Sequence, residues 1–429
     1  MQKSLDWQRM NNKGTMEQKN KLIPELRFPE FVNDGVWEIK TVSDVAHYEN
    51  GKAHEQDIVI DGKYIVVNSK FISTDGEVVK FTNEALCLAE ENDILMVLSD
   101  VPNGRAIAKC FYVDKNNLYT VNQRICKLKP FDINGKILYY LLNRNPYFLA
   151  FDDGVKQTNL KNNDVLDCPI TLPKKTKDSS KEQQKIADCL SSLDELITAH
   201  NDKLETLKNH KKGLLQNLFP QEGQTTPNYR FPEFVNYGEW EEDALGKICD
   251  VRDGTHDSPK YVLKGYALIT SKNLLTTGEI DSENVNYITE NDYQQINKRS
   301  KVNIDDILFG MIGTIGNPVI VKKDGFAIKN VALIKSIGMI DQKFLLQQLK
   351  SNYILKQFEK ENAGGILKFI ALGTIRNLNI VIPSISEQKK IEKCLSTIEN
   401  LITAQTEKVE QLKIHKKGLM QGLFPKIEE

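Results

Sequence analysis

Residues 182–220 read EQQKIADCLSSLDELITAHNDKLETLKNHKKGLLQNLFP, and residues 387–425 read EQKKIEKCLSTIENLITAQTEKVEQLKIHKKGLMQGLFP, so one long stretch of this chain occurs twice. The two copies are identical at 24 of 39 positions without a gap. A shorter segment also repeats: RFPEFVNDGVW at 27–37 and RFPEFVNYGEW at 230–240 agree at nine of eleven positions. A period of about 200 residues is too long for a solenoid unit, so we expect two similar halves.

The segments between these repeats differ strongly between the two halves, although weak echoes remain. Asn68-Ser69-Lys70 parallels Thr270-Ser271-Lys272, and Asp93-Ile94-Leu95 parallels Asp306-Ile307-Leu308. The sequence therefore predicts an alternation of variable domains and near-constant helices. The expected parts are a disordered tail at 1–24, a variable domain at 25–180, a helix at 181–220, a linker at 221–229, a second variable domain at 230–385 and a second helix at 386–425.

Each copy of the long repeat carries apolar residues at alternating spacings of four and three. This spacing is typical of a helix that packs against another helix along a heptad seam. His200, Lys211, Gln405 and Lys416 interrupt the seam at equivalent positions. The predicted seam residues are Ile186, Leu190, Leu193, Ile197, Leu204, Leu207, Leu214, Leu218, Ile391, Leu395, Ile398, Ile402, Val409, Leu412, Leu419 and Leu423.

Each predicted helix needs a partner for its apolar stripe, and the other copy is the obvious one. Two similar halves in one chain imitate a homodimer, and a two-fold axis across the pair makes the helices antiparallel. Roughly 36 residues at ~1.5 Å each give a rod of about 54 Å. With complete overlap, His200 is expected to face Val409, and Gln405 to face Leu204. The alternative is a parallel, tandem pair without a two-fold axis.

Local signals mark where both helices begin. Ser180 stands three residues before Gln183, and Ser384 stands three residues before Glu387. This spacing is that of a capping box, in which the two side chains bond each other's backbone N–H groups. We therefore expect Ser180 and Ser384 to cap the two helices.

Glycine and proline mark the other ends. Pro220 and Pro425 close the two segments, because proline cannot continue a helix. Gly213 and Gly418 lie within the last turns, where glycine destabilises a helix by about 1 kcal/mol. Either the regular helix ends at these glycines, or another backbone approaches them closely. The second interpretation is favoured, because the apolar spacing continues past both residues.

The variable regions have the composition of mixed domains. Turn signals such as Asp61-Gly62, Asn103-Gly104 and Asp324-Gly325 separate short apolar runs. Strands are predicted at 64–68, 94–98, 106–113, 304–309 and 318–321, and helices at 134–143 and 341–360. The predicted fold class is α+β, with two similar globular domains separated by a long, pseudo-two-fold, antiparallel coiled coil.

Polar and basic side chains in the predicted loops are suited to contact DNA. Arginine and lysine bind guanine edges and phosphates, and asparagine and glutamine pair with adenine. The candidates of the first domain are Asn68, Ser69, Lys70, Asn103, Arg105, Arg124, Lys156, Gln157, Asn159 and Lys161. Those of the second domain are Arg252, His256, Ser271, Lys272, Asn273, Arg299, Thr314, Asn317 and Lys368.

The sequence offers no pattern for catalysis. The six histidines form no triad spacing, and the seven cysteines are scattered without a metal-ligand motif. Gly310-Met-Ile-Gly313-Thr-Ile-Gly316 is not a dinucleotide fingerprint, so we expect it to shape a turn after a strand. No catalytic residue, metal or cofactor is therefore predicted in this chain.

Composition limits the class of protein further. The net charge is −1, which argues against a general DNA coat but permits local DNA-binding patches. No apolar run is long enough to span a membrane, and the first residues lack an apolar signal core. These features predict a cytoplasmic protein.

From about Pro24 to Pro425, this arrangement resembles the specificity subunits of type I restriction–modification systems. The resemblance is carried by the Arg-Phe-Pro-Glu-Phe…Trp starts at 27–37 and 230–240 and by Glu-Gln-x-Lys-Ile at 182–186 and 387–391. It is also carried by the Lys-Lys-Gly-Leu…Leu-Phe-Pro helix ends, and by an Asp-Ile-Leu strand followed by a glycine loop at 306–316. The first domain has a single glycine, Gly104, in the corresponding loop.

The resemblance implies a function and a set of partners. Each variable region would be a target recognition domain that reads one half of a bipartite, asymmetric double-stranded DNA sequence, and the helices would fix the gap between the half-sites. Two modification subunits, which bind S-adenosylmethionine and methylate adenine N6, would dock on the chain. Two restriction subunits would add translocation and cleavage driven by ATP with Mg²⁺.

Two alternative functions remain open from the residues alone. The chain could be the recognition part of a fused restriction enzyme, but such a fusion needs methyltransferase and nuclease motifs that this sequence lacks. It could instead be a structural coiled-coil scaffold that never contacts DNA. The scaffold does not explain why two similar helices carry such divergent domains.

Overall fold

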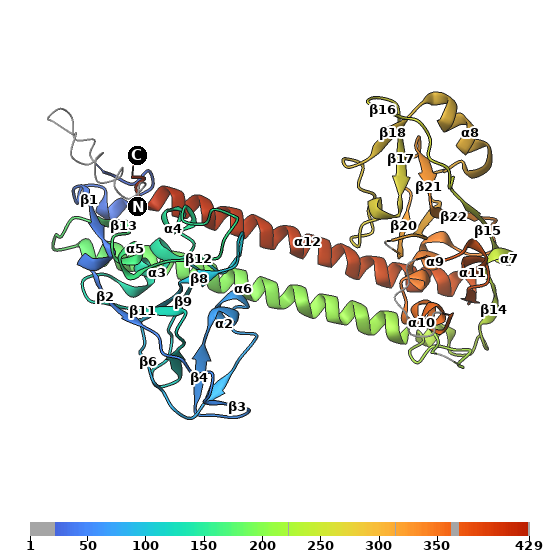
Figure 1. Cartoon of the computed structure of the whole chain (residues 1–429). Helices are drawn as coiled ribbons and strands as arrows, with labels where there is room; N and C mark the ends of the chain where they lie inside the picture. The colour runs from blue at the N-terminus through green and yellow to red at the C-terminus, as the bar shows by residue number, and fades with distance from the viewer. Residues whose placement is uncertain (1–21, 222, 314, 362–368, 428–429) are drawn as a thin grey trace. The chain divides into compact units, whose positions relative to one another are not determined.

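The computed structural model describes residues 22–221, 223–313, 315–361 and 369–427, so nearly all of the predicted tail at 1–24 lies outside the described residues. The chain divides into two compact units. Unit 1 combines the chain up to Ala199 with the segment from Val409 onward, and unit 2 is His200–Lys408. Both boundaries fall inside the long helices α6 (Ser179–Asn217) and α12 (Ile385–Leu423) (Figure 1). Each unit therefore holds one variable domain together with parts of both helices.

Unit 1 contains two principal sheets. A four-stranded antiparallel sheet has the order β2-β11-β7-β9, and a five-stranded sheet has the order β3-β5-β4-β10-β6, with β4 and β10 parallel. Two short pairs, β1–β13 and β12–β8, complete the domain. The strands are β1 (Trp37–Thr41), β2 (Ala46–Asn50), β3 (Ile58–Val59), β4 (Tyr64–Val67), β5 (Phe81–Thr82), β6 (Leu88–Ala89), β7 (Ile94–Val97), β8 (Ser99–Asp100), β9 (Cys110–Tyr112), β10 (Tyr119–Val121), β11 (Ile125–Pro130), β12 (Thr158–Asn159) and β13 (Pro169–Pro173).

The helices of unit 1 close its main core against the long helices. Ile94, Leu128, Leu138 and Phe148 share one buried cluster with Leu190 of α6. Apart from the long helices, the helical segments are η1 (Pro29–Phe31), η2 (Val42–Asp44), α2 (Ser69–Ser73), α3 (Gly135–Leu142), α4 (Pro146–Leu149) and α5 (Asn162–Leu166). A second cluster fills the space between the two sheets, around Val67, Leu95 and Val121.

Unit 2 repeats this sheet topology. Its sheets have the orders β15-β22-β19-β20 and β16-β18-β17-β21, with β17 and β21 parallel, as β4 and β10 are in unit 1. The strands are β14 (Glu241–Ala244), β15 (Cys249–Asp253), β16 (Tyr261–Val262), β17 (Tyr266–Thr270), β18 (Asn286–Ile288), β19 (Ile307–Gly310), β20 (Gly316–Ile320), β21 (Ala327–Lys329), β22 (Val331–Ser336) and β23 (Asn379–Ile382). The helical segments are η3 (Pro232–Phe234), α7 (Leu245–Ile248), η4 (Ser271–Asn273), α8 (Glu290–Ser300), α9 (Gln342–Leu349), α10 (Asn352–Glu361) and α11 (Leu372–Arg376).

The predicted short elements agree with the structure in kind, with two differences. The strand predicted at 106–113 is reduced to β9, because the Asp100 carboxylate accepts the backbone N–H groups of Ala106 and Ile107. The helix predicted at 341–360 is two helices, α9 and α10, which are separated at Ser351. The glycine loop after β19 is a hairpin connection to β20, as the sequence predicts.

The long helices run antiparallel within unit 1. Leu190 of α6 shares the core with Leu423 near the end of α12, whereas Asp194, one turn further along α6, pairs with the earlier Lys416 at 2.5 Å. Leu419 and Met420 pack against the same core. The C-terminal turns of α12 therefore complete the core of the N-terminal domain.

Unit 2 has the same antiparallel arrangement. Lys211 pairs with Glu399 at 2.7 Å, and Gln405 donates hydrogen bonds to the ring nitrogen and the backbone oxygen of His200. The predicted partner of Gln405 was Leu204, so the register prediction was wrong by one helical turn at this point. All sixteen predicted seam residues are buried or half-buried, and the parallel alternative was wrong in both units.

The predictions for the helix ends were partly confirmed, because Pro220 and Pro425 lie just beyond the ends of α6 and α12. Ser180 lies inside α6 and does not cap it. Ser384 does accept the N–H of Glu387 at 3.4 Å, but the Glu387 side chain is bound by an arginine instead of closing a capping box. Gly213 and Gly418 lie within continuous helix, and a Cβ atom on either would meet nothing within 4 Å in the described part of the chain. Neither interpretation offered for these glycines holds.

Candidate nucleic-acid interface

A buried ion pair joins each variable domain to a long helix. Arg27 binds both carboxylate oxygens of Glu182 at 2.7 and 2.8 Å, and Arg230 binds those of Glu387 at 2.8 Å. The glutamate side chains are 1% exposed in both units. The third arginine nitrogen donates to the backbone oxygen of Gly35 or Gly238. The two repeated motifs therefore recognise each other and fix each domain on its helix.

The glutamines that follow these glutamates form a second contact between each long helix and its domain. Gln183 accepts the backbone N–H of Asn134, and Gln388 accepts that of Asp341, both at 2.9 Å. Asn134 and Asp341 are the N-cap residues of α3 and α9. In each long repeat, the glutamate therefore binds the start of the domain, and the adjacent glutamine binds the N-terminus of a core helix.

A polar cluster lies further along the helices in each unit. In unit 1, Tyr140 of α3 donates to Asp194 at 2.7 Å, and Lys416 lies over the tyrosine ring. In unit 2, Gln347 and Lys350 approach Glu399, the counterpart of Asp194 in the repeat. Burial raises the pKa of Glu399, but the charges of Lys350 and Lys211 outweigh that effect and hold the pKa below its ordinary value.

Several candidate DNA-contacting residues of unit 1 gather around the short β8–β12 pair. Gln157 donates to Ser99 at 2.6 Å, and Asn103 donates to the backbone oxygen of Gly154 at 3.2 Å. The backbone of Arg124 binds that of Leu98, which directly precedes β8. These contacts bring two loops 50 residues apart onto one edge of the domain. Asn103, Arg105, Arg124, Lys156, Gln157 and Asn159 are all exposed.

The other candidates of unit 1 lie elsewhere. The Asn68 side chain accepts the N–H of Phe71 and caps α2, so its oxygen has a structural role. Ser69 is half-buried in the first turn of that helix, whereas Lys70 is exposed. Lys161 is exposed at the start of α5.

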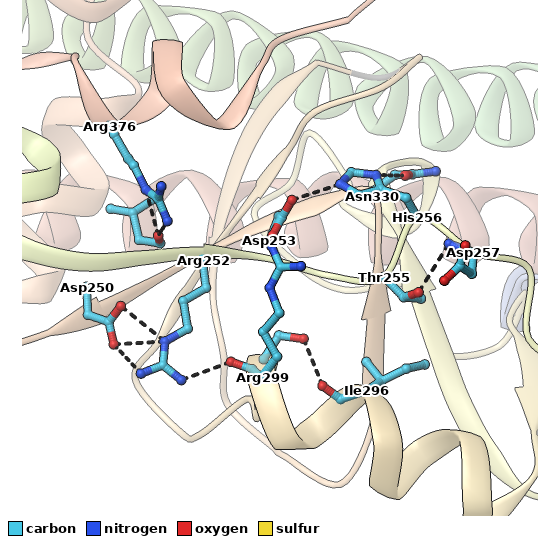
Figure 2. Close-up of polar contacts among 12 residues, drawn as sticks. Asp250, Arg252, Asp253, Thr255, His256, Asp257, Ile296, Arg299, Asn330 and Arg376 are labelled. Carbon is cyan, nitrogen blue, oxygen red and sulfur yellow. Dashed lines mark hydrogen bonds and ion pairs between the residues drawn. The ribbon is translucent and has the colours of Figure 1, made fainter.

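In unit 2 a charged network surrounds the end of β15 (Figure 2). The Asp253 carboxylate, 8% exposed, binds His256 Nε2 at 2.8 Å through one oxygen and Arg299 of α8 through the other. His256 Nδ1 lies 2.9 Å from Oδ1 of Asn330. Arg252 binds Asp250 through two nitrogens and donates to the backbone oxygen of Arg299. The hydrogen bonds with Asp253 and Asn330 raise the pKa of His256 above its ordinary value.

Two candidates of unit 2, Ser271 and Asn273, are interior residues in this structure. Ser271 is 3% exposed, donates to the backbone oxygen of Asn330, and accepts the N–H of Met311. Asn273 is 2% exposed and bonds Thr270, Asp281 and Asn284. Their hydrogen-bonding groups are consumed in holding loops together.

The remaining candidates of unit 2 differ in position. Lys272 is exposed between the two interior residues. Asn317 is half-buried at a φ of 45° and donates to the backbone oxygen of Leu274. Thr314 and Lys368 lie outside the described residues.

Sequence reasoning missed Asp253, Asn330 and Gln123 of the polar loops. A signal for this region exists, because Asn50-Gly51-Lys52 and Asp253-Gly254-Thr255 stand at the ends of the equivalent strands β2 and β15. A Cβ on Gly51 would collide with the backbone of Asn122, and one on Gly254 with the backbone of Ile328, so both positions require glycine. Gly51 thus lies against the turn after β10, and Gly254 lies against β21 just before the corresponding turn. Nearby side chains contact these turns, Glu55 at Gln123 and His256 at Asn330.

The candidate interface consists of polar and charged side chains on exposed loops. Among the described residues, no group of three or more His, Cys, Asp or Glu side chains is placed to hold a metal ion. No helix in the described ranges is long and apolar enough to cross a membrane. The exposed arginine, lysine, histidine and amide groups at the loops can bind phosphates and base edges.

Both units contain a four-stranded antiparallel sheet of the same topology, and each domain is clamped by an arginine to one long helix. This arrangement defines a protein of two tandem α+β domains. The sequence matches the family described as "Type I restriction modification DNA specificity domain" twice, over residues 35–209 and 237–413. These matches cover well over half of the chain. The chain belongs to this family, and the matched segments correspond to the two halves of the internal repeat.

Individual relatives agree with the family. The type I restriction enzyme MjaVIII specificity subunit of Methanocaldococcus jannaschii is 27% identical over 433 residues, which cover 95% of each chain. The putative type I restriction enzyme MjaX specificity subunit of the same organism is 27% identical over 324 residues, 73% of this chain and 72% of that one. The specificity-subunit lengths therefore match that of this protein closely.

Two solved structures show the same fold. The crystal structure of the S subunit of the type I restriction–modification system from M. genitalium superposes with a TM-score of 0.60 at 18% identity, covering 94% of this chain and 100% of that one. A chain from a structure described as showing complex assembly and conformational transition of the type I R-M system superposes with a TM-score of 0.53 at 14% identity, covering 90% and 97%.

Proposed function

We propose that this chain is the DNA-recognition subunit of a type I restriction–modification complex and is not itself an enzyme. Each variable domain is a target recognition domain that reads one half of a bipartite, asymmetric DNA sequence. The single observation that carries this proposal is the repetition of one sheet topology and one Arg–Glu clamp around loops of different sequence. A shared scaffold that carries different polar loops in each domain is suited to reading two unlike half-sites.

The proposal extends to the partner subunits. Two modification subunits would dock on the paired helices and the domains, bind S-adenosylmethionine and methylate adenine N6. Two restriction subunits would supply ATP- and Mg²⁺-dependent translocation and cleavage. The net charge of −1 supports sharing of phosphate contacts with such partners, because a stand-alone DNA-binding protein usually needs a larger positive excess. The helices would fix the gap between the half-sites.

The decisive test is methylome sequencing of a host that expresses this chain with its modification subunit. We expect methylated adenines in one split motif, with a fixed gap of unspecified bases between two half-sites. The same modification subunit without this chain is the control, and it should give no such motif. A methylome without a split motif, in cells where the complex assembles, would contradict the proposal.

The two alternatives make different predictions. A coiled-coil scaffold gives no retarded band with any duplex, even with the modification subunit present. A fused enzyme gives methyl transfer by the purified chain alone with labelled S-adenosylmethionine. We expect DNA binding by the complex and no methyl transfer by the chain alone.

A further inference from the structure

We infer that Asn330, in the turn between β21 and β22, reads a purine in the half-site bound by unit 2, and that His256 decides which end of its amide faces the DNA. This inference rests on the proposed function and deepens it by naming a base-reading residue and the residue that positions it. Nothing in the sequence patterns pointed to Asn330, because it is a single asparagine in a short turn.

The backbone of Asn330 is fixed on both sides. Its N–H donates to the backbone oxygen of Thr255 at 3.1 Å, and its carbonyl accepts the hydroxyl of Ser271 at 2.8 Å. Its φ of 54° lies in the left-handed region, which asparagine tolerates better than most residues. The half-buried side chain therefore projects from a fixed point at the edge of the domain.

The amide is oriented by the histidine. His256 Nδ1 faces Oδ1 of Asn330, and Nε2 faces Oδ2 of Asp253. When the ring is protonated, both of its nitrogens donate, Nε2 to Asp253 and Nδ1 to the amide oxygen of Asn330. The amide oxygen is thus held toward the ring, and Nδ2 faces away from it. No described residue accepts a hydrogen bond from this nitrogen. An outward amide nitrogen donates, and purine N7 is an acceptor on the major-groove edge.

Unit 1 shows the opposite polarity at the corresponding turn. The residues between β10 and β11 are Asn122-Gln123-Arg124, and Gln123 Nε2 donates to the carboxylate of Glu55 at 3.2 Å. The amide nitrogen of Gln123 is therefore engaged, which leaves its oxygen as the outward group. An outward oxygen suits a donor such as the amino group of adenine or cytosine. The same turn, held by a different side chain, would thus present a donor in one unit and an acceptor in the other.

The charges around His256 couple this orientation to pH. Asp253 of β15 favours the protonated ring of His256, and Arg299 of α8 opposes it. Lys329, the residue before Asn330, donates a hydrogen bond to Ser258. Asp257 is the next residue after His256 in the sequence. When Nδ1 loses its proton it becomes an acceptor, so the amide must turn and donate Nδ2 to it. The outward group then changes from donor to acceptor, and purine binding weakens as the pH rises through the pKa of His256.

The test uses the full chain in complex with its modification subunit and duplexes that carry the motif from the methylome. Each purine of both half-sites is replaced in turn by its 7-deaza analogue, which lacks N7, and the Kd is measured. We expect one position at which the analogue weakens binding by the wild-type complex about five- to tenfold, as the loss of one hydrogen bond should. Asn330→Gly keeps the left-handed backbone and should bind both duplexes equally at that position.

Further variants separate reading from folding. Asn330→Asp keeps the acceptor for His256 but removes the outward donor, so it should also lose the discrimination. Asn284→Ala removes an exposed amide elsewhere in unit 2 and should leave the whole profile unchanged. In the wild type the 7-deaza effect should fade as the pH rises, and His256→Ala should abolish that pH dependence.

Two results would overturn the inference. In the first, the Asn330→Gly complex still loses affinity at every position where the 7-deaza analogue weakens binding by the wild-type complex. In the second, the loss of affinity caused by the 7-deaza analogue in the wild-type complex does not depend on pH. Failure of the proposed function looks different, because the complex would then yield no split motif from which to build the duplexes.

Discussion

At the scale of single residues, the most informative feature is the ion pair that joins the short repeated segment of each half to its long repeated helix. Arg230 and Glu387 are 157 positions apart, and their side chains are 10% and 1% exposed. Breaking a buried pair by removing one partner leaves an uncompensated charge, whereas replacing both partners with apolar residues is often tolerated. The pair is thus more sensitive to single than to double substitution.

We predict that Arg230→Met destabilises unit 2 by about 3–5 kcal/mol, because Glu387 then remains charged and buried. The double variant Arg230→Met with Glu387→Met should recover most of this loss. Denaturant unfolding of the full chain, monitored by hydrogen exchange of β15 and β22, measures both effects. A double variant as unstable as the single one would show that hydrogen bonds to Gly238, and not the buried charge, dominate.

At the scale of elements, the long helices combine a predictable seam with unpredicted details. Apolar spacing identified the buried stripe, whereas the partner of Gln405 depended on side-chain reach across the interface. Gly213 and Gly418 interrupt neither helix and contact nothing that requires glycine. Their only local effect is the entropic cost of glycine in a helix interior.

Gly213→Ala and Gly418→Ala are therefore expected to stabilise the protein by about 0.5–1 kcal/mol each, because alanine is the better helix former and its Cβ has open space. Thermal unfolding of the purified chain measures the gain. Gly422→Ala is the matched control on α12, since its Cβ would lie 2.6 Å from the Leu26 side chain. Equal gains at Gly418 and Gly422 would contradict this packing argument.

At the scale of the whole molecule, unit 1 is discontinuous in sequence, whereas unit 2 is the single stretch His200–Lys408. Unit 1 closes only with the segment from Val409 onward, which contributes Leu419, Met420, Leu423 and Phe424 to the N-terminal core. The core of the N-terminal domain is thus completed by a segment that follows unit 2 in the sequence.

We predict that truncation after Lys408 lowers hydrogen-exchange protection throughout unit 1, most clearly in β2, β7 and β11, because their core loses its apolar cover. Unit 2 should retain its protection. Removal of residues 426–429 alone is the control and should change neither unit, since the side-chain contact of Lys426 with described residues is an exposed ion pair with Glu25. Full protection of β7 and β11 in the truncated chain would contradict the assignment of this segment to unit 1.

The sequence by itself determined the features that repeat or have a period: two halves, two helices with an apolar seam, mixed domains and membership of a family. These signals are local or self-similar, so they can be read without knowing which distant residues meet. Only the tertiary structure decided that Arg27 binds Glu182, that Ser271 and Asn273 are interior, and that Asp253, His256 and Asn330 form one network. Contacts of this kind join residues tens to hundreds of positions apart. Their free energy depends on burial and exact partner geometry, neither of which leaves a pattern along the chain.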